Sequence, residues 1–134
     1  MADSQPIDLL VITPERQVLE ASADAVVIPA HDGELGVLRD RAPVLCELGI
    51  GQLRYTQAGV PRRVFIDGGF AQVIENHVTV LTSRALPADQ ITKEVVAAAE
   101  RAVEEHKGLD TESRDARERA QKRLSVLRSM HTTD

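Results

Sequence analysis

Residues 7–83 are divided by turn-forming residues into short runs of aliphatic and β-branched side chains, and this punctuation restricts the fold more than any other feature. Short runs of this kind, bounded by Gly, Pro, Asn or Asp, are typical of β-strands. The sequence predicts strands at 7–12, 24–28, 51–57, 63–66, 70–75 and 78–82. Many short strands joined by tight turns favour a β-sandwich or a flattened barrel.

The periodicity of the apolar residues changes after Pro87, from the alternation of strands to the spacing of helices. An amphipathic helix is predicted over residues 89–107 and a second over 111–130. The second helix places five apolar side chains along one stripe: Ala116, Ala120, Leu124, Leu127 and Met130. Two helices joined by so short a connection run antiparallel. We therefore predict two units, a β-sandwich in residues 1–86 and a helical hairpin in residues 87–134.

The facing sides of the two predicted helices consist largely of alanine. Alanine lets two helix axes approach closely, but it buries little apolar area per residue. A hairpin of this kind is marginal by itself, because helices in proteins gain most of their stability from packing. We expect the hairpin to dock on the sandwich or on a partner, and to be able to detach.

Composition excludes several classes of function. Hydrophobic residues make up 43% of the chain but aromatic residues only 2%, so the core must consist of Val, Ile, Leu and Ala. Proteins that bind single-stranded nucleic acid need exposed rings for stacking, and this chain has too few. The net charge of −5 also argues against a nucleic-acid partner. A local basic excess occurs in residues 116–131, where Glu118 is outnumbered by Arg117, Arg119, Lys122, Arg123 and Arg128.

No arrangement of residues predicts a catalytic centre, a metal or a cofactor. The sequence has neither a phosphate-binding loop nor a dinucleotide-binding fingerprint. Its four histidines, at 31, 77, 106 and 131, lack the spacing of zinc ligands. Cys46 is the only cysteine, so no internal disulfide forms and a reducing compartment is expected. The sequence has neither an export signal nor an apolar stretch long enough to span a membrane, which predicts a soluble, unexported protein.

Two blocks of the sequence resemble the epsilon subunits of bacterial F-type ATP synthases. Residues 27–45 read VIPAHDGELGVLRDRAPVL, which is similar to the family's Gly-Glu-Leu-Gly turn and the His-Ala-Pro segment that follows it. Residues 65–73 read FIDGGFAQV and are followed by VTVL, which resembles the family's paired strands around a Gly-Gly turn. With the opening VITPE at 11–15, the resemblance covers nearly all of residues 7–83.

The resemblance implies a non-catalytic subunit of the central stalk, with a ten-stranded, mainly β N-terminal sandwich followed by an antiparallel two-helix hairpin. The sandwich of this family binds the rotating γ subunit and the polar loops of the membrane c-ring. The resemblance assigns the c-ring contact to a turn of four residues: His31, Asp32, Gly33 and Glu34. It assigns a contact with γ to Arg41, Ala42 and Pro43, although the family more often has His at the position of Arg41.

The resemblance also implies a regulatory role for the hairpin. In this family the helices lie beside the sandwich or extend into the catalytic head, where basic residues of the second helix meet acidic segments of the catalytic subunits and oppose ATP hydrolysis. The corresponding residues here are Arg119, Lys122 and Arg123. Nucleotide-binding members carry Ile-Asp-x-x-Arg-Ala on the first helix, whereas residues 91–96 read ITKEVV. Only Ile91, Arg119 and Arg123 match in part, so ATP binding is not predicted.

The family's location implies a peripheral protein at the cytoplasmic face of the bacterial inner membrane, within the ATP synthase complex. Its partners there would be the γ subunit, the c-ring loops and the α and β subunits of the catalytic head, without insertion into the membrane. From the residues alone two alternatives remain open. One is a β-sandwich adaptor with a helical hairpin, unconnected with rotary motors. The other is a nucleotide sensor whose hairpin folds when ATP binds.

Overall fold

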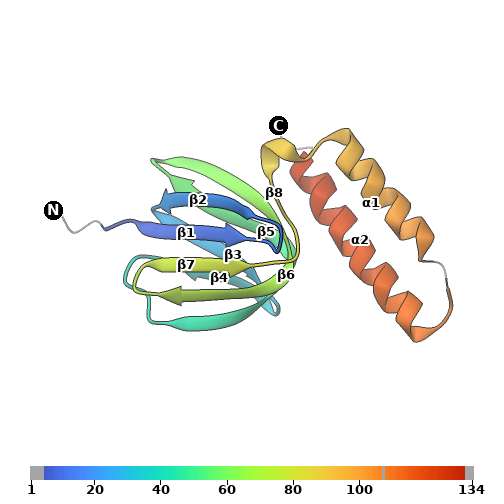
Figure 1. The fold of residues 1–134 in the computed structure, drawn as a ribbon, viewed down its shortest axis with the longest axis horizontal. Helices are drawn as coiled ribbons and strands as arrows, with labels where there is room; N and C mark the ends of the chain where they lie inside the picture. Colours follow the sequence, from blue (N-terminus) through green and yellow to red (C-terminus); the bar gives the residue numbers. More distant parts are fainter. Residues whose placement is uncertain (1–4, 107, 132–134) are drawn as a thin grey trace.

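The computed structural model of the chain describes residues 5–106 and 108–131, and it shows a β-sandwich followed by two helices (Figure 1). The strands are β1 (Ile7–Ile12), β2 (Gln17–Ala23), β3 (Ala25–Ala30), β4 (Gly33–Val37), β5 (Val44–Gln57), β6 (Val60–Ile74), β7 (His77–Leu81) and β8 (Ala85–Pro87). The helices are a short 3-10 turn η1 (Ala88–Gln90), α1 (Lys93–Glu105) and α2 (Thr111–His131). The prediction of a mainly β sandwich followed by a helical hairpin is confirmed.

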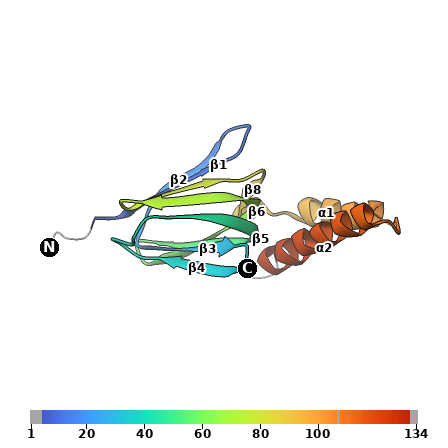
Figure 2. The same cartoon turned by 90° about the horizontal axis from the view of Figure 1, so that it is seen from below.

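One continuous sheet forms both layers of the sandwich because its two longest strands bend (Figure 2). The strand order is β2-β1-β7-β6-β5-β3-β4, with β8 paired to β6. The first layer contains β2, β1, β7 and the parts of β6 and β5 at 70–74 and 44–48. The second contains β8, β3, β4 and the remaining parts of β6 and β5. Eight continuous strands thus provide the ten segments, five in each layer, that the family resemblance implied.

Glycines at the bend of β6 allow its side chains to change face. The residues of β6 that point into the core have even numbers up to Ile66 and odd numbers from Ala71. Between these positions Gly68 and Gly69 have φ angles of 71° and 108°. A side chain on Gly69 would also collide with the carbonyl oxygen of Leu81. Glycine is therefore required where the strand passes from one layer to the other.

The core between the two layers is built from strand residues alone, and nearly all of them are aliphatic. Leu53, Val64 and Ile66 are at most 1% exposed, and Tyr55 is the one aromatic residue of this cluster. The prediction of a core made of Val, Ile, Leu and Ala is confirmed. Such a core suits short strands, because β-branched side chains pack well on a pleated surface.

The sequence pattern misses β2, β4, β8 and the first part of β5, and it divides β6 into two strands. One reason is that proline, glycine and aspartate bound the predicted strands, although such residues also occur within β3 and β4. Pro29 instead lies within β3, and its missing N–H falls where the pairing of β3 with β5 is interrupted, between Val27 and Ala30. Gly33 begins β4 with a φ of 142°, so the breaker and the strand overlap.

The α1 helix begins at Lys93 rather than at residue 89, so the predicted start is wrong. The hydroxyl oxygen of Thr92 accepts a hydrogen bond from the backbone N–H of Val95 at 3.3 Å, which caps the helix at this position. Residues 88–90 form η1 instead, and the predicted end at residue 107 lies outside the described residues.

The α2 helix is capped by Asp110. A carboxylate oxygen of Asp110 accepts a hydrogen bond from the backbone N–H of Ser113 at 3.2 Å. Hydrogen bonds from Ser113 hold the pKa of Asp110 below its usual value, so the cap is ionised near neutral pH. A negative charge at this position also favours the N-terminal end of the helix dipole.

The hairpin docks on the outer surface of the second layer through a small apolar cluster. Its buried members are Phe65 from β6, Ile91 before α1, and Leu127 and Met130 from α2, each at most 4% exposed. Figure 1 shows both helices beside one end of the sandwich, with α2 nearer to the strands. The docked position predicted as one possibility is therefore the one observed here.

Candidate functional site

The four residues predicted to contact the c-ring lie in the turn between β3 and β4 and at the start of β4, and all four are exposed. His31 and Asp32 form the turn itself. The carboxylate of Glu34 accepts two hydrogen bonds from the guanidinium of Arg54 in β5, at 2.7 and 3.1 Å. The hydrogen bond from Arg54 holds the pKa of Glu34 below its usual value. The turn is thus anchored on the sandwich, and the charge of Glu34 is compensated there.

The segment predicted to contact γ lies between β4 and β5, at the opposite end of β4 from that turn. Arg41 is half-buried, whereas Ala42 and Pro43 are exposed. The preceding Asp40 has a φ of 64°, and its backbone N–H donates to Oδ1 of Asn76 at 2.7 Å. Nδ2 of Asn76 donates back to the Asp40 carboxylate at 3.2 Å. These bonds join the segment to the connection between β6 and β7.

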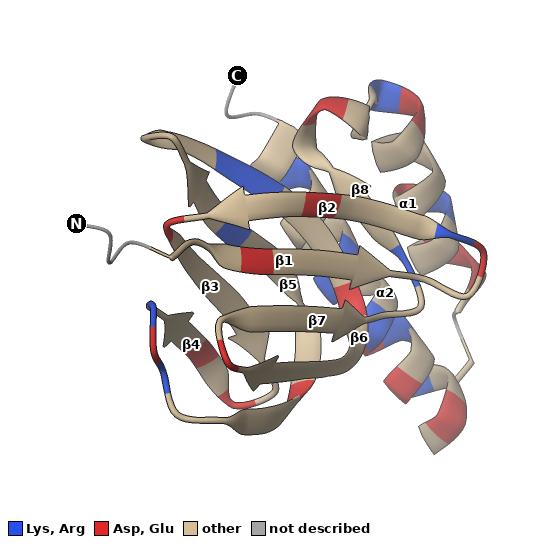
Figure 3. Cartoon of the chain, turned by 60° about the vertical axis from the view of Figure 1, so that its left-hand side comes forward, with Lys and Arg blue, Asp and Glu red and all other residues tan. Residues whose placement is uncertain are grey.

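An exposed apolar face, which the sequence pattern does not reveal, covers part of the first layer. It consists of Leu45, Phe70, Ile74 and Leu81, with exposed fractions of 71%, 54%, 42% and 53%. Phe70 and Leu81 are cross-strand partners, and Leu45 is paired with Gln72 between Phe70 and Ile74. In Figure 3, β7 and the adjoining part of β6 are tan, because these segments carry no Lys, Arg, Asp or Glu.

This apolar face continues at both of its edges. A groove of about 440 Å³ adjoins Leu81 and is lined also by Ile12 and Pro14. At the other edge Pro43 leads directly into β5 and Leu45. The signal in the sequence is that β6 has apolar residues at both alternating positions after its bend, so one set must face outward.

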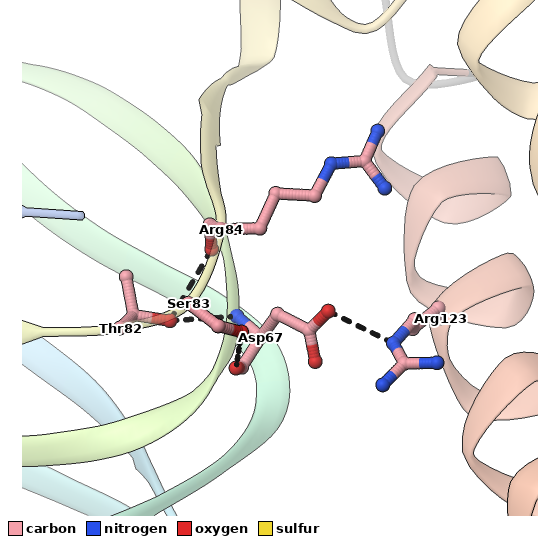
Figure 4. Close-up of polar contacts among 5 residues, drawn as sticks. All are labelled: Asp67, Thr82, Ser83, Arg84 and Arg123. Atoms are coloured by element: carbon pink, nitrogen blue, oxygen red, sulfur yellow. Dashed lines mark hydrogen bonds and ion pairs between the residues drawn. The ribbon is translucent and has the colours of Figure 1, made fainter. Parts of the chain in front are cut away.

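The three basic residues predicted to inhibit hydrolysis lie on α2 in different environments. Arg119 and Lys122 are exposed, whereas Arg123 is half-buried. Nε of Arg123 donates a hydrogen bond to a carboxylate oxygen of Asp67 in β6 at 2.8 Å (Figure 4). The structure therefore brings Arg123 to the sandwich and leaves the other two cations at the surface.

The residues that partly match a nucleotide site are not gathered around one space. Ile91 is buried in the apolar cluster beneath the hairpin, and Arg119 is exposed on α2. Arg123 borders a cavity of about 290 Å³ that is lined by Asp67, Arg84 and four alanines. The hydroxyl of Thr92, where nucleotide-binding members have Asp, is used as the cap of α1. That ATP does not bind stays a prediction.

The described residues offer no metal site and no membrane-spanning helix. In residues 5–106 and 108–131 no group of three or more His, Cys, Asp or Glu side chains is placed to hold a metal ion. Neither α1 nor α2, the two α-helices of this part of the chain, is long and apolar enough to cross a membrane.

Comparison with known proteins assigns the sandwich to a family. The family model for the ATP synthase delta/epsilon chain β-sandwich domain covers residues 6–88. The ATP synthase epsilon chain of Rhodopirellula baltica is 53% identical over 83 residues, which are 62% of this chain and 65% of that protein. The epsilon chain of Synechococcus sp. is 38% identical over 119 residues, covering 89% and 85%. The alignments with the epsilon chains of R. baltica and Symbiobacterium thermophilum span just under two thirds of those proteins, 65% and 64%.

Solved structures agree with this assignment. A chain of the Euglena gracilis mitochondrial ATP synthase, in a structure of OSCP, F1 and the c-ring, superposes with a TM-score of 0.77 at 27% identity, covering 96% of this chain and 84% of that chain. A chain of the Tetrahymena thermophila central stalk and c-ring superposes with a TM-score of 0.68 over 96% of this chain and 98% of that chain, and at 13% identity it shows the fold alone. The family match over the sandwich and the epsilon-chain relatives whose alignments extend into the hairpin lead to one conclusion: the chain belongs to the family of ATP synthase epsilon chains.

Proposed function

We propose that this chain is a non-catalytic subunit of the central stalk of a bacterial, proton-translocating F-type ATP synthase. In this role it couples rotation to ATP synthesis and restrains ATP hydrolysis, at the cytoplasmic face of the inner membrane. The observation that carries the proposal is an exposed apolar face on a self-contained sandwich, which also holds a separate hairpin by few contacts. Membership of the family favours this role over an adaptor unconnected with rotary motors.

The γ subunit is proposed to bind the apolar face together with residues 41–43. Leu45, Phe70 and Leu81 each leave more than half of their surface exposed, at 71%, 54% and 53%. Clustered apolar side chains on an exposed sheet are unfavourable in water and mark interaction sites on soluble proteins. Because Pro43 leads directly into β5, the segment extends the same surface toward the connection between β6 and β7.

The c-ring loops are proposed to contact the turn between β3 and β4, at His31, Asp32, Gly33 and Glu34. This turn and the segment at 41–43 lie at opposite ends of β4, so one rigid sandwich can bind two partners at once. Anchoring of Glu34 by Arg54 fixes the shape of the turn before binding, which reduces the entropy lost on association.

The hairpin is proposed to oppose hydrolysis by extending into the catalytic head, where α and β subunits would meet Arg119, Lys122 and Arg123. Charge pairing is the expected interaction, because the alanine-rich stripe of α2 offers little apolar area for a second binding site. ATP is not a ligand in this proposal.

Two substitutions with matched exposure test the proposed γ surface. Leu81→Asp places a charge in the apolar face, whereas Val60→Asp does so on the second layer, and the two side chains are 53% and 48% exposed. Calorimetry with purified γ subunit should show binding weakened about a hundredfold by Leu81→Asp, because a charge would be buried without a partner. Val60→Asp should bind like the wild type. Equal affinities for all three proteins would contradict the assignment of this face.

A further inference from the structure

The ion pair between Asp67 and Arg123 joins the sandwich to the middle of α2, and it is partly shielded from water. The side chains of Asp67 and Arg123 are 12% and 32% exposed, whereas the pair Arg128–Glu100, which joins α2 to α1, is 56% and 48% exposed. Partial burial strengthens a charge pair and reduces screening by salt. The Asp67 pair is thus a stronger candidate for a structural contact than the surface pair.

Hydrogen bonds of its own backbone hold Asp67 in place independently of the hairpin (Figure 4). Its N–H donates to Oγ1 of Thr82 at 3.2 Å and to the carbonyl oxygen of Arg84 at 3.1 Å. Its carbonyl oxygen accepts a hydrogen bond from Ser83 at 3.0 Å. All these groups belong to the sandwich or to the connection before β8, so they remain when the hairpin leaves. The bend therefore keeps the Asp67 carboxylate in the same position when the hairpin is detached, so that Arg123 can bind it again.

Next to the Asp67–Arg123 pair, the other contacts between hairpin and sandwich leave part of the interface unfilled. The apolar cluster lies nearer the C-terminal end of α2, at Leu127 and Met130. Next to the ion pair is the cavity of about 290 Å³, walled by Ala98, Ala99, Ala102 and Ala120. An unfilled space contributes no packing energy. Beside this cavity the ion pair therefore adds a direct bond between the central part of α2 and the sandwich.

We propose that Asp67 is a latch that holds the hairpin on the sandwich and, in doing so, occupies Arg123. The latch rests on the proposed function in one respect. Asp67 competes for Arg123 with the acidic group of the catalytic head that Arg123 is proposed to bind. While Asp67 binds Arg123, only Arg119 and Lys122 of the three proposed inhibitory cations stay at the surface. Docking of the hairpin thus both withdraws α2 and neutralises its central charge.

The latch is tested on the full isolated chain by the distance between two spin labels. Labels at Ser22→Cys in β2 and Ser125→Cys in α2, in a Cys46→Ala background, report whether the hairpin is docked, since both serines are exposed. Asp67→Asn keeps the backbone hydrogen bonds and removes only the charge. It should raise the ratio of detached to docked hairpin about tenfold. An unchanged distribution of distances would overturn the proposal.

A second variant and a matched control make the test specific. Arg123→Gln should detach the hairpin to a similar extent, and the double variant should detach it no further than either single one, because all three lack the same pair. Additive effects would overturn the latch. Arg114→Gln removes a positive charge from an exposed position of the same helix. This control should leave the hairpin docked.

Measurements on the assembled ATP synthase separate the latch from the inhibitory role. Asp67→Asn should lower the rate of ATP hydrolysis about twofold or more, because a hairpin released from the sandwich extends more often. If Asp67→Asn detaches the hairpin of the isolated chain but hydrolysis stays at the wild-type rate, the latch stands and the proposed inhibition falls. If the isolated chain shows no detachment, the latch falls whatever the hydrolysis rate.

Discussion

The sandwich and the hairpin differ in how much of their structure they can maintain alone. Seventeen buried residues form the sandwich core, and all of them come from strands. The cluster beneath the hairpin has four, of which Phe65 belongs to the sandwich. Within the helices α1 has no buried residue, and α2 has Ala120, Leu127 and Met130. We therefore expect the sandwich to fold by itself and the hairpin to depend on the surface against which it packs.

The chain therefore has two separate stabilities, the free energy of hairpin docking and the free energy of sandwich unfolding. Removing the hairpin would leave the core between the layers intact, but removing the sandwich would take away the surface that orders the helices. Elements held by few buried contacts open with a smaller free energy than the global unfolding of the domain. We expect the hairpin to detach many times for each unfolding of the sandwich.

The largest effect is expected from Leu53→Ala in the sandwich core. Leu53 is 0% exposed, and truncating a buried leucine typically costs about 2–5 kcal/mol. The midpoint of urea unfolding, followed by circular dichroism of the strands, should fall accordingly. Val60→Ala, at a position that is 48% exposed, is the control and should change the free energy of unfolding by less than about 0.5 kcal/mol. Equal midpoints for both variants would contradict the core described here.

Leu127→Ala removes a side chain of the same size and the same 0% exposure from the cluster under the hairpin. It should weaken docking by about 2–3 kcal/mol while the unfolding midpoint of the sandwich stays nearly constant. Hydrogen exchange of the full chain distinguishes the two events, because amides of α2 should exchange faster and those of β1 and β7 should not. Faster exchange in all of these elements would show that hairpin and sandwich unfold together.

A smaller effect is expected on the enzyme from replacing Arg119, Lys122 and Arg123 together by Ala. Alanine keeps the helix and removes three positive charges, so hydrolysis by membranes carrying the variant should rise roughly threefold at low salt. The difference from the wild type should narrow as salt screens the charges. Proton-driven synthesis should change less, since the proposed contacts to γ and the c-ring lie on the sandwich. A difference that does not depend on salt would exclude charge as the cause.

Features set by residues close together in the sequence could be predicted, whereas contacts between distant residues could not. The apolar stripe of α2 is set by residues a few positions apart and was predicted, and three of its five members, Ala120, Leu127 and Met130, are buried. The pair Asp67–Arg123 joins residues that are 56 positions apart, and no pattern in either segment indicates the other. The outward-facing apolar side chains of β6 cannot be recognised from the sequence. Because the strand changes face at Gly68, apolar residues occupy both alternating positions after the bend.

The smallest effect concerns the ion pair in the turn between β3 and β4. The hydrogen bond from Arg54 lowers the pKa of Glu34 from its ordinary value of 4.5. A lowered pKa in the folded state contributes stability above the pKa of the unfolded chain, and this contribution is lost as the pH falls through the folded pKa. Glu34→Gln should therefore reduce stability slightly at pH 7 and not at pH 2. Thermal unfolding at both pH values checks this, and an equal loss at pH 2 would contradict the ionic origin.

The separation of roles between sandwich and hairpin is tested most directly by ending the chain after Leu86 and assembling the remaining residues 1–86 into the ATP synthase. The shortened chain should fold, stay in the complex with γ and support proton-driven ATP synthesis, because its core comes from strands alone. Hydrolysis of ATP should be faster than with the full chain. A shortened chain that is unfolded or absent from the complex, or one that assembles and hydrolyses ATP at the rate of the full chain, would contradict this separation of roles.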